Sequence, residues 1–165
     1  MLWRWIYVSQ SMIGAETADA VVARILKGSA VNNAALGVTG ALVMGRGRFA
    51  QFLEGSEESI LHLKGRISVD RRHAQATTIE FGGGYQARQF ADWSLAYAGP
   101  SNFFAQILGR VQLGQSQQKP SVRDDILMVF SEFAATPQPG SEAPTPAKGA
   151  HRTPRASDEA RELRN

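Results

Sequence analysis

Residues 32–55 have the sequence NNAALGVTGALVMGRGRFAQFLEG, and this stretch decides the fold. Two short apolar runs, 41–44 and 49–53, flank a turn at 45–47 that contains two glycines. Apolar runs joined by a short glycine-rich turn predict a β-hairpin. Gln51 lies in the middle of the second run, where packing explains it poorly, because a buried amide must find hydrogen-bond partners.

Strands and helices alternate on both sides of the hairpin. In chain order, the predicted elements are a strand at 3–9, a helix opened by 14–17 and ended by 32–33, the hairpin, a helix capped by Ser56 and ended by 70–73, a strand at 77–81, a turn at 82–84 and a strand within 88–97. Two helices in a βαββαββ order pack on one face of a mixed sheet. The predicted fold class is therefore α+β, a ferredoxin-like arrangement with a mixed five-stranded sheet.

Beyond residue 98 the pattern changes. Helical spacing at 103–108 and 121–134 predicts a C-terminal helical extension that covers the bare face of the sheet or mediates dimerisation. From residue 136 the chain holds five of its seven prolines, which predicts a disordered tail. The predicted organisation is thus a domain at 1–98, a helical pair at 99–135 and a Pro-rich tail at 136–165.

The composition excludes several classes of site. The chain has no cysteine, so disulfides, thiolate metal sites and cysteine nucleophiles are excluded, and its three histidines lack the spacing of metal ligands. No apolar run approaches the roughly 20 residues of a membrane helix, and the first residues lack a signal-peptide cleavage site. We expect a soluble, cytoplasmic protein. The net charge of +3 is small and dispersed, which does not indicate a nucleic-acid partner.

Several candidate residues have both a functional and a structural interpretation. Tyr7 and Ser9 share one face of the first strand. They are either part of a site or the polar end of an amphipathic strand. Ile25 shares a helix face with small residues that let a flat group approach, although spacing alone favours a core role. Arg66 and Asp70 lie four apart on one helix face, where they can simply pair with each other.

Five motifs occur together in the order and at the spacing of a known family. They are Tyr7-x-Ser9, Asn32-Asn33-x-x-x-Gly37-Val38-Thr39-Gly40, Phe49-x-Gln51-x-Leu53-Glu54-Gly55, Asp70-x-Arg72-His73 and Arg88-x-Phe90-x-x-Trp93-Ser94. Over about residues 2–98 the chain thereby resembles the BLUF family of blue-light sensors that use FAD. Each motif alone is weak, whereas the hairpin motif combined with Tyr7 and Gln51 is specific.

The resemblance implies a flavin held between the two helices of the domain. The cofactor-binding residues that it implies are Asn32, Asn33, Gln51, Ile25, Phe49, Arg66, Asp70, Arg72 and His73. In the family, the two asparagines hydrogen-bond the isoalloxazine edge and the two apolar residues sandwich the ring. The residues near the end of the second helix line the ring or approach the ribityl and phosphate part. FAD is the expected cofactor, with FMN and riboflavin as alternatives.

The resemblance also implies a photoactive group of Tyr7, Gln51, Trp93 and Ser9. In the family scheme, the excited flavin takes an electron and a proton from the tyrosine through the glutamine. The amide then rotates or tautomerises, the radicals recombine, and a red-shifted state with a changed hydrogen-bond network remains. A neutral phenol is a donor, and an amide has both a donor and an acceptor end, which suits these roles.

The signalling output departs from the family pattern at one position. The family commonly has Trp-Ser-Met in the fifth strand, where this chain has Trp93, Ser94 and Leu95. Leucine cannot supply the sulfur that is often linked to output, which bears on the signalling route and not on flavin binding. No effector domain follows the sensor, so the resemblance implies a homo-oligomer that signals to a downstream effector protein.

Two other classes of function remain open from the residues. The first is a flavin-free ferredoxin-like module that only binds partners, which the retained Tyr7 and Gln51 argue against. The second is a small hydrolase with His73 and Asp70 as an acid–base pair, although no nucleophile stands beside them in a recognisable motif. We therefore expect a photosensory flavoprotein and not an enzyme.

Overall fold

A computed structural model describes residues 1–14, 18–91, 96–98, 102–115 and 118–135. The elements are β1 (Leu2–Ser11), α1 (Ala18–Ala35), β2 (Thr39–Gly45), β3 (Arg48–Gly55), α2 (Glu57–Ser68), β4 (His73–Tyr85), β5 (Ala96–Ala98), α3 (Asn102–Gly109) and α4 (Pro120–Ala135). None of the helices within the described ranges is both long and apolar enough to span a bilayer.

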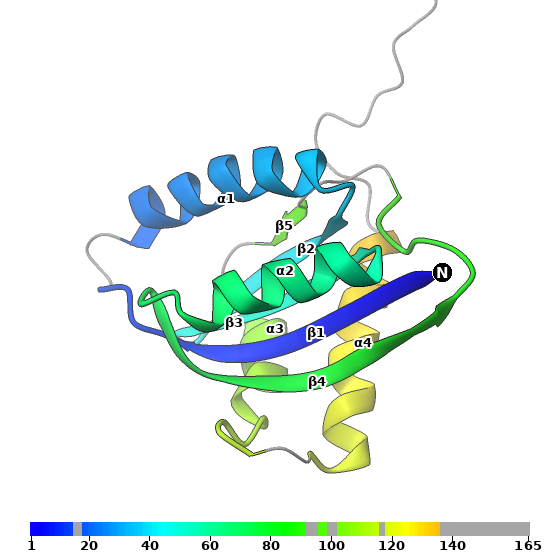
Figure 1. Cartoon of the computed structure of the whole chain (residues 1–165). Coiled ribbons are helices and arrows are strands. Elements are labelled where there is room, and N and C mark those ends of the chain that lie inside the picture. The colour runs from blue at the N-terminus through cyan, green and yellow to red at the C-terminus, as the bar shows by residue number, and fades with distance from the viewer. Residues whose placement is uncertain (15–17, 92–95, 99–101, 116–117, 136–165) are drawn as a thin grey trace, which may run out of the picture.

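The strands form a sheet in the order β4-β1-β3-β2-β5 (Figure 1). The first four are long and antiparallel, and the short β5 pairs in parallel with β2 at one edge. Each helical connection passes over a neighbouring strand, because α1 joins β1 to β2 and α2 joins β3 to β4. This is the ferredoxin-like α+β fold that the sequence predicts.

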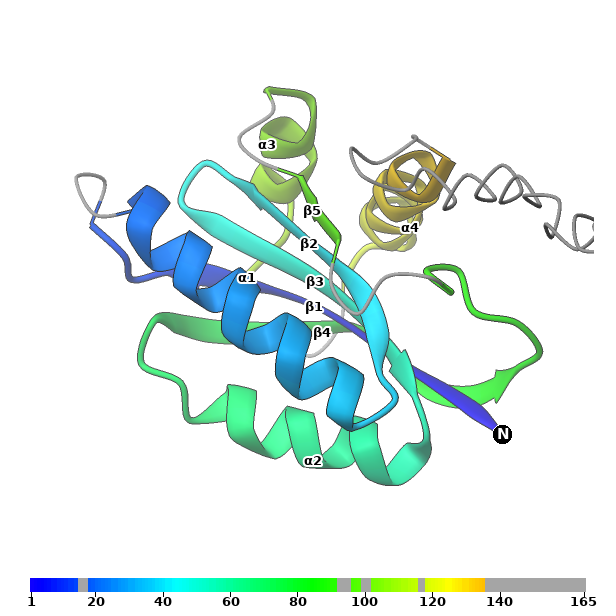
Figure 2. The ribbon, with the colours of Figure 1, turned by 90° about the horizontal axis from the view of Figure 1, so that it is seen from above.

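The helices cover both faces of the sheet. Helices α1 and α2 lie side by side on one face, and α3 and α4 lie on the other (Figure 2). On the α3–α4 side, a core cluster joins Phe52 of β3 to Phe90 and to Phe130 of α4. On the opposite side the core is divided in two: α2 packs on Trp5 and Leu53, and α1 packs on Leu42 and Phe49.

Several predicted boundaries differ from the structure. Helix α1 continues to Ala35, past its predicted end at 32–33, and most of its predicted start at 14–17 lies outside the described residues. Helix α2 ends at Ser68, capped by Val69, so 70–73 do not close it and His73 begins β4. The predicted N-cap of α2 is confirmed, since Ser56 Oγ accepts the N–H of Ser59 at 3.1 Å.

The glycines at 82–84 are part of β4, although their composition predicts a turn. They pair with the start of β1, where Gly83 lies opposite Trp3. A Cβ at Gly83 would come within 2.7 Å of Trp3 Nε1, so the missing side chain makes room for the indole. Of the strand predicted within 88–97, residues 88–91 contain no strand, 92–95 lie outside the described residues, and 96–97 belong to β5.

A close backbone approach between β2 and β3 leads to a stability prediction. A Cβ at Gly40 would lie 1.9 Å from the carbonyl oxygen of Phe52. This oxygen cannot move away, because it belongs to the backbone of the paired strand β3. We expect Gly40→Ala to lower the free energy of unfolding by about 2–4 kcal/mol in urea denaturation. Gly65→Ala is the matched control, because Gly65 lies on exposed helix with open space around it. It should raise stability by about 0.5–1 kcal/mol. Equal stabilities for the two variants would contradict the packing described here.

Candidate functional site

A cleft opens between α1 and α2 above the strands β1, β2 and β3. It lies between the core cluster under α2 and the core cluster under α1, and residues of both clusters line it. Its empty space is about 790 Å³, a figure that includes the part open to solvent. The lining residues are Tyr7, Ile25, Ser29, Asn32, Asn33, Leu42, Phe49, Gln51, Leu63, Arg66, Ile67, Asp70, Arg72 and His73.

The structure brings the candidate residues of the sequence together in this one cleft. All nine of the implied cofactor-binding residues line it, and so does Tyr7. Ser9 lies outside the lining, fully buried in β1. Trp93 and Leu95 are outside the described residues.

Tyr7 and Gln51 form a buried hydrogen bond at the floor of the cleft. They are direct partners in the antiparallel pairing of β1 with β3, so their side chains lie next to each other on one face. The Tyr7 hydroxyl donates to Gln51 Oε1 at 2.6 Å, and the two residues are only 4% and 7% exposed. The amide NH₂ of Gln51 is then the group that this residue can offer to a ligand.

The surroundings of Tyr7 keep its phenol neutral. Burial raises the pKa of Tyr7 well above its usual value, the negative charge of Asp70 raises it further, and the positive charge of Arg72 opposes the shift. Trp5 stacks on Tyr7 with ring centroids 4.4 Å apart, and its Nε1 donates to Thr78 Oγ1 at 3.1 Å. The phenol is therefore held in one orientation as a hydrogen-bond donor.

A charged pair follows α2 at the mouth of the cleft. Arg72 Nε lies 2.9 Å from both carboxylate oxygens of Asp70, and the Arg72 backbone N–H donates to the same carboxylate at 2.9 Å. These hydrogen bonds lower the pKa of Asp70. The structural interpretation in which Asp70 pairs with Arg66 is thus wrong. Asp70 pairs with Arg72, and Arg66 has no ion-pair partner among the described residues.

His73 shows an unsatisfied ring nitrogen beside the cleft. Its Nε2 lies 2.9 Å from the carbonyl oxygen of Ile67, which accepts only, so Nε2 carries the proton. In the neutral ring Nδ1 is then an acceptor, and it is buried without a partner among the described residues. Because Asp70 is engaged by Arg72, the acid–base pair of the hydrolase interpretation is not formed. A buried acceptor without a donor indicates a group that the protein alone does not supply.

The donor set fits a flavin. Asn32, Asn33 and Gln51 supply amides, which can meet both the carbonyl oxygens and the ring N–H at the edge of an isoalloxazine. Apolar side chains come from both helices, with Ile25 from α1 and Leu63 from α2. A flat ring with a polar edge has suitable partners on each of these sides.

Some lining residues were not predicted from the sequence. Leu42, Leu63 and Ile67 complete the cleft, and Trp5 stacks on Tyr7. Ser29 also lines it and is one of the small residues beside Ile25 that were expected to let a flat group approach. Leu63 and Ile67 are four apart in the apolar stripe of α2, so spacing could have identified them. Leu42 required the strand register, which pairs it with Gln51.

The sequence matches the family described as sensors of blue-light using FAD (BLUF) over residues 2–96. It is 29% identical over 92 residues to the photoactivated adenylate cyclase subunit beta of Euglena longa. The aligned region covers 56% of this chain and 10% of that protein. The chain thus corresponds to about a tenth of that relative's length.

Two solved structures illustrate the similarity. The dark state of BlrB, a BLUF protein, is 25% identical with a TM-score of 0.62 and covers 81% of this chain and 96% of that one. BlrP1 of Klebsiella pneumoniae with FMN and cyclic diGMP is 30% identical with a TM-score of 0.52 and covers 60% of this chain and 26% of that one.

The raised pKa of Tyr7 can be tested by alkaline titration. Unfolded tyrosine ionises at a pH of about 10, whereas Tyr7 should stay neutral there as long as the protein is folded. The difference in phenolate absorbance between wild type and Tyr7→Phe should therefore remain flat through pH 10. The same comparison in denaturant, as the control, should show one additional tyrosine ionising near pH 10. Because the unfolded chain loses the proton first, the stability that Tyr7 contributes below pH 10 falls as the pH rises further. A phenolate signal at pH 10 in the folded protein would contradict the buried position.

Proposed function

The chain belongs to the BLUF family of blue-light sensors that use FAD, and on this premise we propose that it senses light through a flavin in the α1–α2 cleft, with Tyr7 and Gln51 as the photoactive pair. The buried hydrogen bond from Tyr7 to Gln51 carries this proposal. It places a neutral phenol and a two-ended amide side by side, with the amide facing the space that a ligand would fill.

The chemistry follows from these two side chains. A bound flavin would supply strong absorption of blue light and an oxidising excited state. Tyr7 would be the electron donor in the cleft, and its proton would have a path along the 2.6 Å hydrogen bond to Gln51 Oε1. Once electron and proton had both returned to Tyr7, there would be no net change in covalent bonds, and Gln51 could have exchanged its donor and acceptor ends. The result is a second arrangement of the same hydrogen-bonded groups, which is the basis of a switch.

Water exclusion favours this arrangement. Trp5 covers one face of Tyr7 and the β1–β3 pairing covers its backbone, so the phenol and the amide have few competing partners. In a buried site each arrangement must satisfy the polar groups, which makes intermediate arrangements costly. We also propose Ser9 as a member of the photoactive group, because it follows Tyr7 by two positions on β1 and its fully buried hydroxyl has no hydrogen-bond partner among the described residues.

We propose FAD as the cofactor, with FMN and riboflavin as alternatives. The related BlrP1 was solved with FMN, so a protein similar to this chain accepts the shorter flavin. In this chain the charge of Arg72 is balanced by Asp70, whereas Arg66 is exposed at the cleft. Arg66 is thus suited to meet a flavin phosphate by charge attraction.

The output is proposed to be a contact with another protein. The Euglena relative is named as a cyclase, and this chain covers only a small part of it. We propose that residues 1–98 sense light, that the pair at 99–135 transmits the signal to an effector protein in the cytoplasm, and that the protein acts as a homo-oligomer without catalysing a reaction itself. Residues 136–165 are proposed as a tail outside this unit.

The photoactive pair is tested by absorption spectroscopy. The purified protein should be yellow, and blue light should shift its flavin spectrum to the red, with recovery in the dark. Gln51→Leu and Tyr7→Phe should keep the bound flavin and lose the red shift completely. The control is Tyr85→Phe, because Tyr85 lies on β4 and bonds Glu80 away from the cleft; its red shift should be normal. A red shift in either cleft variant would show that the residue roles are wrong, and a protein that takes up no flavin would exclude the function.

The role of Arg66 is tested by flavin affinity. Arg66→Gln should weaken binding of FAD and FMN by about two- to fivefold and leave riboflavin unchanged, because an exposed charge pair contributes up to about 1 kcal/mol. Fluorescence titration at low and high salt measures this, and the difference should shrink at high salt. Arg24→Gln is the matched control, since Arg24 is exposed on α1 and does not line the cleft. Equal weakening for riboflavin would place Arg66 at the ring instead.

A further inference from the structure

A second buried polar residue lies on β3, on the face opposite to Gln51. Glu54 follows Gln51 by three positions and is fully buried, with 0% exposure. Side chains alternate along a strand, so Glu54 points to the same face as Phe52, toward α4. A charged group in this position is retained only when donors surround it.

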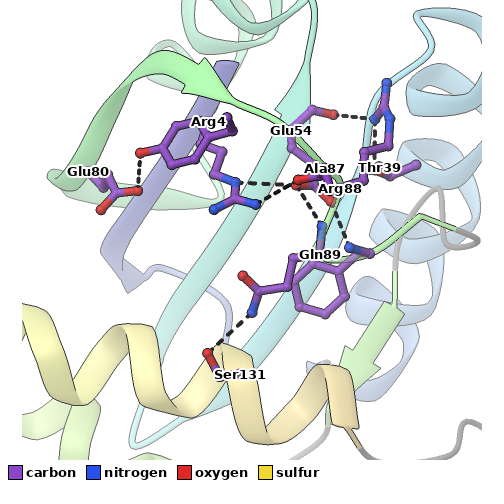
Figure 3. A network of polar contacts seen from close by, with 10 residues as sticks. Arg4, Thr39, Glu54, Glu80, Ala87, Arg88, Gln89 and Ser131 are labelled. Atoms are coloured by element: carbon purple, nitrogen blue, oxygen red, sulfur yellow. Dashed lines mark hydrogen bonds and ion pairs between the residues drawn. The ribbon is translucent and has the colours of Figure 1, made fainter. Parts of the chain in front are cut away.

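The donors of Glu54 come mainly from the loop that follows β4. Its Oε1 accepts the backbone N–H of Phe90 at 2.7 Å, and its Oε2 accepts the N–H of Gln89 at 3.0 Å (Figure 3). The Thr39 hydroxyl donates to Oε1 at 3.3 Å, and Arg4 Nε lies 3.4 Å from Oε2. The carboxylate thereby ties residues 89 and 90 to the end of β3.

Arg88 ties the same loop to the sheet a second time. Its NH1 group donates to the carbonyl oxygen of Glu54 and to Thr39 Oγ1, each at 2.8 Å, and its NH2 group donates to the carbonyl oxygen of Gly37 at 2.7 Å. Thr39 therefore bridges Arg88 and the Glu54 carboxylate. The loop has no helix or strand of its own at 86–91, so these bonds determine its position.

The other end of this connection is α4. The Phe90 ring is buried, and its centroid lies 6.4 Å from that of Phe130 and 6.3 Å from that of Phe133. Beside it, Gln89 Nε2 lies 3.5 Å from Ser131 Oγ, which Figure 3 shows reaching from the loop to the helix. The two loop residues that Glu54 holds by their backbone thus both have side chains that contact α4.

We propose that the Glu54 carboxylate, with the loop at 86–91, is the connection through which a rearrangement of Gln51 changes the state of α4. This inference rests on the proposed function and adds a route for its signal. Gln51 and Glu54 share one short strand, so a shift of β3 under the amide also shifts the carboxylate. Two short hydrogen bonds to backbone N–H groups are directional, and a buried carboxylate that loses one of them is left unsatisfied. The loop therefore follows the strand or changes position as a unit.

A competing route exists through direct packing. Phe52 of β3 contacts Phe130 of α4, with ring centroids 5.5 Å apart. Apolar contacts of this kind are not directional, so they accommodate a small strand shift without moving the helix. The two routes differ in their dependence on the carboxylate, which makes them separable by experiment.

Hydrogen exchange of the α4 amides in dark and light, together with the flavin spectrum of the same sample, tests the proposal. In the wild type, illumination should change the exchange rates of α4 several-fold. Glu54→Gln keeps the size of the side chain but replaces one accepting oxygen by a donor, which cannot accept the N–H of Gln89 or Phe90. This variant should keep the red shift and lose the light-dependent change in α4. The matched control is Arg123→Gln, which removes the ion pair of α4 with Glu80 on β4 and leaves Glu54 untouched; it should keep both.

Each other outcome is decisive. A folded Glu54→Gln protein whose α4 still responds to light overturns the proposal in favour of the Phe52–Phe130 contact. If Glu54→Gln does not fold, Arg88→Gln is judged by the same two measurements and should again separate red shift from helix response. Loss of the response in Arg123→Gln, or a wild type with a red shift and an unresponsive α4, also overturns it while the proposed function stands. A wild type that binds flavin without any red shift overturns the proposed function instead.

Discussion

The hydrogen bond between Tyr7 and Gln51 is the constraint on which the rest of the structure depends. It requires β1 and β3 to be neighbours in one register, because a shift by one residue would turn both side chains to the other face. That neighbourhood exists only when the connections through α1 and α2 pass over adjacent strands. Helices α1 and α2 then lie on the same face of the sheet as Tyr7 and Gln51, and the cleft between the helices is a consequence of the topology.

The sheet separates two polar groups with different tasks. On the face covered by α1 and α2, Gln51 has one end of its amide bonded to Tyr7 and the other end available to the cleft, so its hydrogen-bond partners can change. On the opposite face, Glu54 is surrounded by donors from a loop and from β2, so its state is set by the position of those elements. A single strand of eight residues carries both. Its backbone therefore connects the α1–α2 cleft with the loop that contacts α4.

Much of the candidate site could be predicted from the sequence. The motifs that resemble the BLUF family contain eight of the cleft residues, and the same resemblance implies two more by position, Ile25 and Arg66. Two of the wrong predictions concern residues whose partners are distant in sequence. Gly83 joins β4 because Trp3 lies over it, and α2 ends at Ser68 because 73 onward pairs with β1. The expected pairing of Asp70 with Arg66 fails for a local reason: α2 ends at Ser68, so Asp70 and Arg72 both lie beyond the helix, where residues two apart come within hydrogen-bond distance.

The sequence by itself determined the order of the elements, the hairpin, the absence of thiol chemistry and the membership of Tyr7 and Gln51 in one family pattern. These properties depend on local composition and period, which a linear chain already contains. Only the tertiary structure decided that Tyr7 donates to Gln51, that His73 leaves a buried nitrogen beside the cleft, and that Glu54 holds the loop which reaches α4. Hydrogen bonds and burial are relations between groups far apart along the chain, and their energies exist only once the sheet has brought those groups together.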